Sequence, residues 1–107
     1  MCLLVYVTAP DTENAAALAR MLVEKHLAAG VNLLPGARSV YRWQGRVREA
    51  RECLLLAQVS KAAFAQFCQA VRENHEYEVP CIVAIPLESG YAPFLDWIAE
   101  NSLPSAQ

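Results

Sequence analysis

The sequence contains few glycines and histidines, and it lacks the short motifs of common enzymes. Only four glycines and two histidines occur among the 107 residues, so a phosphate-binding loop of backbone amides would be hard to build. There is no Gly-x-Ser-x-Gly motif and no pair of carboxylates in a polar setting. A cysteine nucleophile could use only His26 or His75 as its base. These absences favour a binding protein over an enzyme.

Paired cysteines, long apolar runs and a strong net charge are also missing. The four cysteines contain no Cys-x-x-Cys pair, so we expect reduced thiols in a cytoplasmic protein. No apolar run approaches the ~18 residues of a membrane helix. The apolar start, residues 1–7, has no basic segment and is predicted to be a strand, not a signal peptide. A net charge of −2 and a pI of about 5.6 do not favour nucleic acid or an acidic membrane.

What the sequence does contain is a stretch, residues 30–60, that predicts one long β-hairpin. Gln44–Gly45 is its predicted tip, because glycine tolerates the positive φ of a tight turn. Pro35–Gly36 interrupts the first arm and predicts a kink there. The second arm ends in the apolar run 53–57. The base of the hairpin is therefore expected to be buried on both faces.

This hairpin is too long to be stable without a partner. Each arm has about a dozen residues, against ~5–6 for a usual strand, and a two-stranded ribbon is marginal in water. Its outer half would expose Tyr41, Trp43 and two rows of backbone groups. Another copy of the chain is the simplest partner. The hairpin thus predicts an oligomer whose functional site lies where the hairpin meets its neighbour.

The remaining residues are predicted to form two further strands and three helices. Their ranges are strand 2–7, helix 12–28, helix 60–75, strand 77–87 and a short helix 93–98. The first strand is apolar without alternation, which predicts a central position buried on both faces. Gly30 is expected to end the first helix in a left-handed conformation, and Ser60 to cap the second. Residues 103–107 are expected to be a frayed tail.

This order of elements predicts an α+β fold. It is that of a ferredoxin-like βαββαβ sandwich with a long protruding hairpin and a C-terminal helix. Both main helices should cover one face of a four-stranded antiparallel sheet. The length suits a single domain, 1–107.

The same order is used by the RNA-recognition motif, so that alternative needs testing. That module carries alternating aromatic residues on a central strand, whereas residues 52–59 contain none. The hairpin does hold five of the nine cationic side chains: Arg38, Arg42, Arg46, Arg48 and Arg51. Glu49 and Glu52 alternate with them, which favours a solvated or inter-subunit ion-paired hairpin. We therefore predict no nucleic-acid binding.

Metal binding is suggested by His75 and Cys81, which lie within seven residues of each other. An imidazole and a thiolate across a helix–strand turn suit copper or zinc. The alternative is that His75 completes the apolar stripe of a helix and Cys81 packs in the core. Two ligands are too few for a complete site, so the others would come from a neighbouring subunit.

Four segments together resemble the CutA divalent-cation-tolerance family: TAPD at 8–11, LAAGVNLLPGARSVYRWQGRV at 27–47, HEYEVPCIVAIP at 75–86 and YAPFLDWI at 91–98. The resemblance covers nearly the whole chain. It implies a ferredoxin-like homotrimer, similar in architecture to PII signalling proteins, whose long hairpins pack against neighbouring subunits. It also implies tolerance of copper and other divalent cations.

The copper ligands proposed for bacterial members of that family carry over only in part. This sequence has Val7 and Asn74 where those members have a cysteine and a histidine, and His75 alone is retained. Losing a thiolate and an imidazole weakens a soft-metal site. Cys81 stands where glutamate is common and is the candidate replacement.

Three functional hypotheses follow. The first is a cytoplasmic CutA-like homotrimer that binds a divalent cation, copper before others, through His75 and Cys81. The second is a PII-like trimeric sensor or adaptor that binds a small anionic metabolite or a protein partner in clefts between subunits. Those clefts would be lined by Tyr41, Trp43, His75, Tyr77 and the hairpin arginines, Arg38 among them. The third is a stable trimer with no specific ligand.

Overall fold

The computed structural model describes residues 1–105. Over that range the chain forms four strands, three α-helices and one short 3-10 helix. In chain order they are β1 Cys2–Ala9, α1 Thr12–Glu24, β2 Gly30–Trp43, β3 Arg46–Ser60, η1 Lys61–Ala63, α2 Phe64–Asn74, β4 Ile82–Pro86 and α3 Ala92–Asn101. This is the predicted α+β order, with the C-terminal helix added to the βαββαβ unit.

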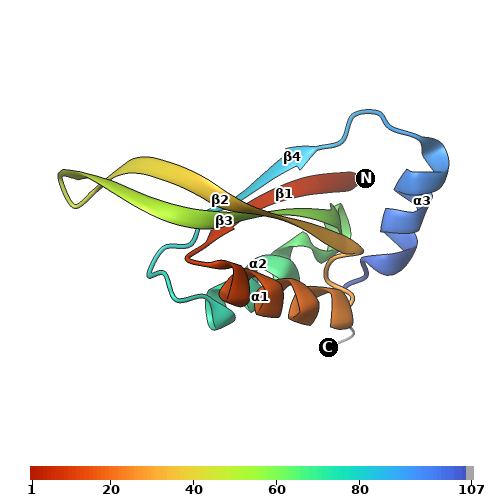
Figure 1. Cartoon of the computed structure of the whole chain (residues 1–107). Helices are drawn as coiled ribbons and strands as arrows, with labels where there is room; N and C mark the ends of the chain where they lie inside the picture. The colour runs from red at the N-terminus through yellow and green to blue at the C-terminus, as the bar shows by residue number, and fades with distance from the viewer. Residues whose placement is uncertain (106–107) are drawn as a thin grey trace.

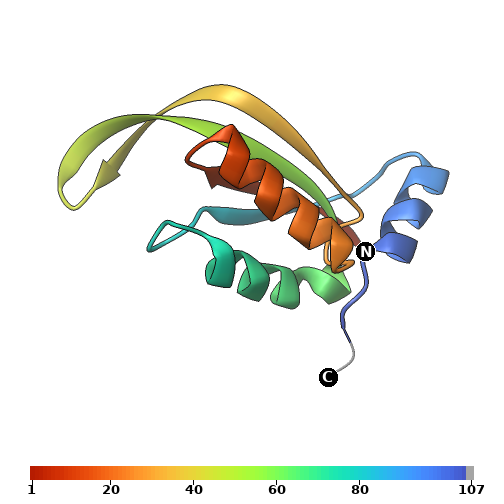
Figure 2. The same ribbon diagram turned by 60° about the horizontal axis from the view of Figure 1, so that its bottom comes forward.

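The strands form one antiparallel sheet in the order β2-β3-β1-β4. Helices α1 and α2 lie side by side against one face of this sheet, and α3 lies at one end of it (Figure 1). At the opposite end the β2–β3 hairpin extends past both helices, as Figures 1 and 2 show. The predicted ferredoxin-like sandwich with a protruding hairpin is confirmed.

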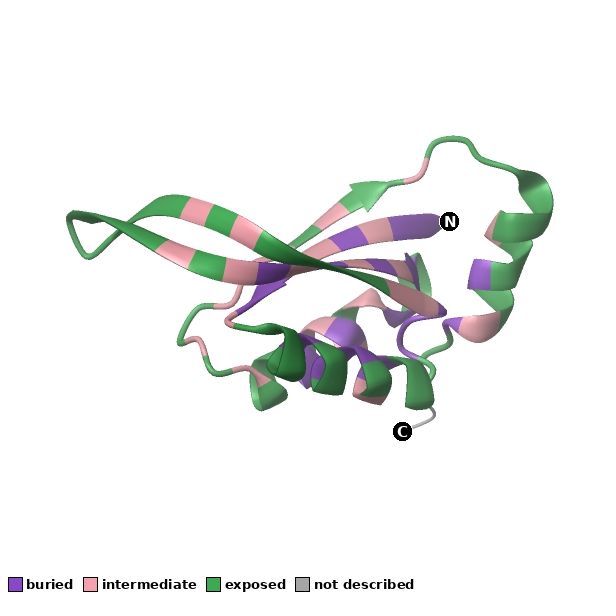
Figure 3. Ribbon diagram, in the orientation of Figure 1, coloured by how far each residue is buried: buried purple, intermediate pink, exposed green. Residues whose placement is uncertain are grey.

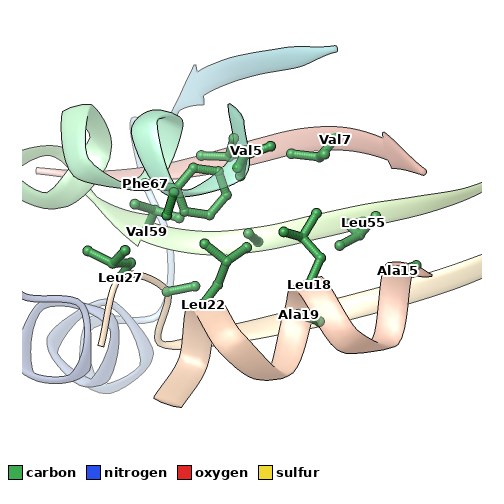
Figure 4. Close-up of a cluster of buried hydrophobic side chains, with 14 of the residues drawn as sticks. Val5, Val7, Ala15, Leu18, Ala19, Leu22, Leu27, Leu55, Val59 and Phe67 are labelled. Carbon is green, nitrogen blue, oxygen red and sulfur yellow. The ribbon is translucent and has the colours of Figure 1, made fainter. Parts of the chain in front are cut away.

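The core lies between the sheet and the two main helices. Alternate residues of the central strands point toward the helices, among them Val5, Val7, Leu55 and Val59, all at most 1% exposed. They meet Leu18 and Leu22 of α1 and Phe67 of α2 (Figure 4). Burying each large side chain of this kind contributes roughly 1.5–3 kcal/mol, so the helical stripes and the strand alternation stabilise the same core.

On the opposite face of the sheet only α3 packs, at the end where Cys2 contacts Ile98, and the rest of that face is uncovered within residues 1–105. Its residues on β1 and β3, Tyr6 and Leu56 among them, are half-buried, and Val83 and Ile85 of β4 are 53% and 52% exposed. Figure 3 shows the resulting alternation of buried and half-buried positions along β1 and β3. The expectation that β1 and the hairpin base are buried on both faces is therefore wrong for a single chain. We call this surface the open face.

The hairpin has the predicted tip and kink. Gln44 and Gly45 have φ angles of 50° and 76°, which are both positive as a tight two-residue hairpin turn requires. The register shifts between Leu34 and Ala37, and Gly36 takes φ 81° there. The kink is thus a β-bulge, in which Pro35 and Gly36 together lie opposite one residue of β3.

Two predicted boundaries were wrong. Helix α1 ends at Glu24, and His26, with φ 60°, takes the left-handed position that was assigned to Gly30. Gly30 instead begins β2. Strand β4 begins only at Ile82, because Pro80 has no N–H to donate to a ladder and residues 75–81 form a loop.

The residues after α3 are held to the domain. The buried Ser102 hydroxyl accepts from the Ser60 N–H at 2.8 Å and donates to the Leu27 carbonyl at 2.9 Å. The Ser105 N–H donates to the Gln66 side chain at 2.7 Å. The predicted frayed tail is therefore wrong as far as Ser105, and residues 106–107 lie outside the described part. As predicted, Ser60 caps the turn that begins the second helical segment.

Candidate functional site

A groove of about 710 Å³ lies on the open face where the hairpin leaves the body of the sheet. Strands β1, β2 and β3 and the loop 75–81 contribute its walls. Its lining residues are Tyr6, Thr8, Arg38, Ser39, Val40, Tyr41, Trp43, Arg48, Glu52, Tyr77, Glu78, Val79 and Cys81. We call this site the hairpin groove.

The β-bulge decides which side chains of β2 share the groove face. Tyr41 pairs with Arg48 across the hairpin, and Trp43 pairs with Arg46. Since successive residues of a strand point to opposite faces, one inserted residue exchanges the faces of everything beyond it. Without the bulge, Tyr41 and Trp43 would lie on the face opposite to Glu52.

Glu52 is the central charged group of the hairpin groove. The Tyr77 hydroxyl donates to its carboxylate at 2.7 Å, although the two residues are 25 positions apart. Burial, and next the hydrogen bond to Glu52, raise the pKa of Tyr77. Burial first, and then the Glu52 charge, also raise the pKa of Cys81. Near neutral pH the Tyr77 phenol and the Cys81 thiol therefore stay protonated beside the two glutamates that line the groove, Glu52 and Glu78.

His75 does not line the hairpin groove, and both of its ring nitrogens are engaged. Nε2 lies 2.6 Å from the Thr8 carbonyl oxygen, which can only accept, so Nε2 carries the proton. Nδ1 then accepts from the Tyr77 N–H at 3.1 Å. His75 thus ties the loop 75–81 to β1. It also follows α2 in extended backbone, so it does not complete a helical stripe.

The residues predicted from sequence are placed as follows. Five of them line the hairpin groove: Arg38, Tyr41, Trp43, Tyr77 and Cys81. His75 and Cys81 do not share a pocket, because His75 lies in a separate small cavity beside α1. The Arg38 side chain is 77% exposed and pairs with Glu49 at 3.6 Å. That pairing leaves Arg48 as the groove arginine without an ion-pair partner in residues 1–105.

Sequence reasoning did not single out Glu52 or Tyr6 as site residues, and it named Arg48 only as one of the hairpin arginines. Part of their placement could have been found, since a two-residue turn at Gln44–Gly45 fixes Tyr41 opposite Arg48. The approach of Tyr77 to Glu52 had no local signal. It depends on how the loop 75–81 packs across the sheet.

One chain supplies an incomplete donor set for a metal ion. The groove contains a thiol, Cys81, and the nearby Glu52 carboxylate, and residues 1–105 contain no group of three or more metal-ligating side chains. A tetrahedral site needs four ligands. The donors that residues 1–105 bring together thus do not make a complete metal site within one chain.

The architecture and this groove can be set beside known proteins. The family model described as CutA1 divalent ion tolerance protein matches residues 3–101. The chain belongs to the CutA1 family. The CutA resemblance seen in the sequence motifs is confirmed, and it extends across every residue that lines the hairpin groove.

Individual CutA proteins are similar to the chain over most of its length. The divalent-cation tolerance protein CutA of Thermus thermophilus is 46% identical over 98 residues, covering 92% of this chain and 95% of that protein. The solved Thermus thermophilus Cut A1 structure has a TM-score of 0.93 at 45% identity and covers 95% of this chain and 99% of that one. For the CutA structure from Archaeoglobus fulgidus the TM-score is 0.92 at 40% identity, with coverages of 95% and 99%.

The names of CutA relatives refer to more than one compartment. The Arabidopsis thaliana protein is called chloroplastic, and the Archaeoglobus fulgidus structure is called periplasmic. Within residues 1–105, no helix is long and apolar enough to cross a membrane. A cytoplasmic location for this CutA-family chain stays a prediction.

Proposed function

We propose that the chain acts in divalent-cation tolerance as a homotrimer that binds a divalent cation, with copper the first ion to test. The observation that carries this proposal is a thiol close to a carboxylate, Cys81 and Glu52, in a groove at the root of an exposed hairpin. Thiolate ligands suit soft metal ions, and copper stands highest in affinity among the divalent first-row ions.

The uncovered apolar surface supports the trimer. Along the open face, Val83 and Ile85 are 53% and 52% exposed, and Tyr6 and Leu56, which lie in register with Val83 on the next two strands, are half-buried. Contiguous apolar surface of this kind marks an interaction site. Copies of the chain would cover it and bring their hairpins together, so each groove could receive ligands from a neighbour.

In this proposal Cys81 is the first metal ligand and His75 the second candidate. His75 can bind an ion only if it releases the Thr8 carbonyl or the Tyr77 N–H. Losing that hydrogen bond lowers the contribution of His75 to the affinity for the metal. Isothermal titration of the metal-free protein with copper(II) tests both residues. Cys81→Ser should weaken binding at least tenfold, and Cys68→Ser, which alters a half-buried thiol on α2 outside the groove, should leave it unchanged.

Two results would contradict the proposal. Copper binding no tighter than that of a competing buffer ligand would remove the metal function. Binding that is unchanged in His75→Ala would remove His75 from the ligand set, and binding unchanged in Cys81→Ser would remove the groove site.

The size and lining of the hairpin groove favour a second function, the PII-like trimeric sensor or adaptor. A groove of about 710 Å³ lined by Tyr41, Trp43 and Tyr77 can hold a metabolite. A thermal-shift screen of nucleotides and small carboxylates against metal ions would separate this function from the first, because a ligand bound to the folded state raises the melting temperature. If every metabolite fails to shift the melting temperature, the sensor function is wrong. A trimer that binds neither class would have a purely structural role.

The proposal also holds that the chain is a cytoplasmic binding protein and not an enzyme. All four cysteines are free thiols, which suits a reducing compartment. Neither histidine lines the hairpin groove, and burial raises the pKa of the Cys81 thiol. A protonated thiol without a neighbouring base is a poor nucleophile.

A further inference from the structure

The hairpin groove carries opposite charges at its two ends. Arg48 and Glu52 both line it, and both lie on the open face of β3. They are four residues apart, which is about 13 Å between Cα atoms at ~3.3 Å per residue. Ser39 and Ala50, which pair with each other between them, have small side chains. The paired positions between Arg48 and Glu52 therefore carry no bulky side chain.

Neither charge has an ionic partner in the described part of the chain. The salt bridge found in residues 1–105 joins Arg38 to Glu49 and includes neither Arg48 nor Glu52. Glu52 accepts a hydrogen bond from Tyr77, but that phenol stays neutral and leaves the negative charge in place. A half-buried carboxylate without a cation is unfavourable, and a cationic group of a ligand would offset this cost.

The groove is also larger than an ion requires. Its volume of about 710 Å³ falls within the ~300–1,000 Å³ of small-molecule sites. Tyr6, Tyr41, Trp43 and Tyr77 line it. Aromatic side chains bury an apolar body well, and the faces of their rings attract an ammonium group.

We infer that the hairpin groove binds a small zwitterion of the chemical class of free aromatic amino acids. The ammonium group lies at Glu52, the carboxylate at Arg48 and the apolar side chain against the aromatic lining. This inference rests on the second function proposed above and changes its ligand. A purely anionic metabolite would meet the charges of Glu52 and Glu78, and a simple cation would leave Arg48 unpaired.

Three ligands of nearly equal size test the inference on the full-length protein. They are L-phenylalanine, 3-phenylpropionate, which lacks the ammonium group, and 2-phenylethylamine, which lacks the carboxylate. Isothermal titration at low salt should show L-phenylalanine binding at least tenfold tighter than either analogue, because only the zwitterion pairs both charges.

Two variants, each of which removes one charge, then test the two charged ends of the groove separately. Glu52→Gln keeps an acceptor for the Tyr77 hydroxyl, and it should bind L-phenylalanine no better than 3-phenylpropionate. Arg48→Gln should bind L-phenylalanine no better than 2-phenylethylamine. Arg42→Gln is the matched control, since Arg42 lies on the same hairpin but does not line the groove, and it should retain wild-type discrimination.

The possible failures can be told apart. If 3-phenylpropionate binds as tightly as L-phenylalanine, the site takes anions, and the zwitterion inference fails while the sensor function stands. If 2-phenylethylamine binds as tightly, the role of Arg48 is wrong. Loss of discrimination in Arg42→Gln equal to that in Arg48→Gln would also overturn the inference. If none of the three ligands binds, the inference is wrong, and the metabolite screen alone then decides the sensor function.

Discussion

His75 shows how the partners of one side chain limit what it can do. Its Nε2–H donates to the Thr8 carbonyl and its Nδ1 accepts from the Tyr77 N–H. Its ring also packs against the Tyr77 ring, with centroids 4.6 Å apart and an interplanar angle of 47°. The residue therefore holds the loop that carries Tyr77 and Cys81 into the hairpin groove, and its value as a metal ligand is reduced by the same bonds.

Replacing His75 by alanine should destabilise the protein by about 1–3 kcal/mol, the usual cost of leaving half-buried polar groups without partners. Urea denaturation at fixed protein concentration measures this change. Glu76→Ala, at the adjacent exposed position, is the control and should stay within about 0.5 kcal/mol of wild type. Equal effects of the two substitutions would show that the His75 bonds contribute nothing.

The protonation of Tyr77 and Cys81 should couple stability to alkaline pH. Both pKa values are raised above their ordinary values of 10.0 and 9.0, so the folded state holds these protons more tightly than the unfolded chain. Their contribution is fully present below pH 9 and is lost as pH rises above 9 for Cys81 and above 10 for Tyr77.

Urea denaturation at pH 7.5 and pH 10.5 checks this sign. Wild type should lose stability at the higher pH, and Tyr77→Phe, which has no proton to lose, should lose less. The same loss in both proteins would mean that Tyr77 is not involved.

Among the elements, α3 packs on Cys2 through Ile98, and the buried Ser102 hydroxyl at its end adds hydrogen bonds to two other segments. Ser102 links the end of α3 to Ser60 at the end of β3 and to Leu27 after α1. Three segments that are distant in sequence thus meet at one residue that is 0% exposed. This contact explains why the chain after α3 is ordered, contrary to the frayed tail that its composition suggested.

Ser102→Ala should cost about 2–4 kcal/mol, because it leaves the buried Ser60 N–H and Leu27 carbonyl without partners. Thermal unfolding followed by circular dichroism measures the change. Ser105→Ala removes an exposed side chain and keeps the backbone bond to Gln66, so it should have little effect. If Ser102→Ala is as stable as this control, the Ser102 hydroxyl does not stabilise the contact between the end of α3 and the domain.

At the scale of the whole molecule, the two faces of the sheet differ in what covers them. The helices bury one face, and the open face keeps Leu54, Leu56, Val83 and Ile85 at least partly accessible. The hairpin adds more apolar surface beyond the body of the domain. The proposed homotrimer is supported by this imbalance, because within residues 1–105 only α3 packs on the open face, and it covers only the end near Cys2.

Light scattering should return three times the 11.8 kDa of one chain. Val83→Asp places a charge on the open face and should lower this mass while the far-ultraviolet circular dichroism is retained. Val23→Asp, on α1 where the side chain is 39% exposed, should leave the mass unchanged. If the wild-type protein has the mass of a single folded chain, the trimer and any groove shared between subunits are wrong.

The sequence by itself determined the features that depend on neighbouring residues. Glycine at the hairpin tip, the Pro35–Gly36 bulge, the capping Ser60 and the apolar periodicities all act over a few positions, and they led to the fold class and the family. The tertiary structure alone decided the contacts between distant positions. Tyr77 reaches Glu52 and His75 reaches Thr8 across separations of 25 and 67 residues. These contacts depend on how a loop packs on the sheet and on which face the bulge presents, and no local pattern encodes either.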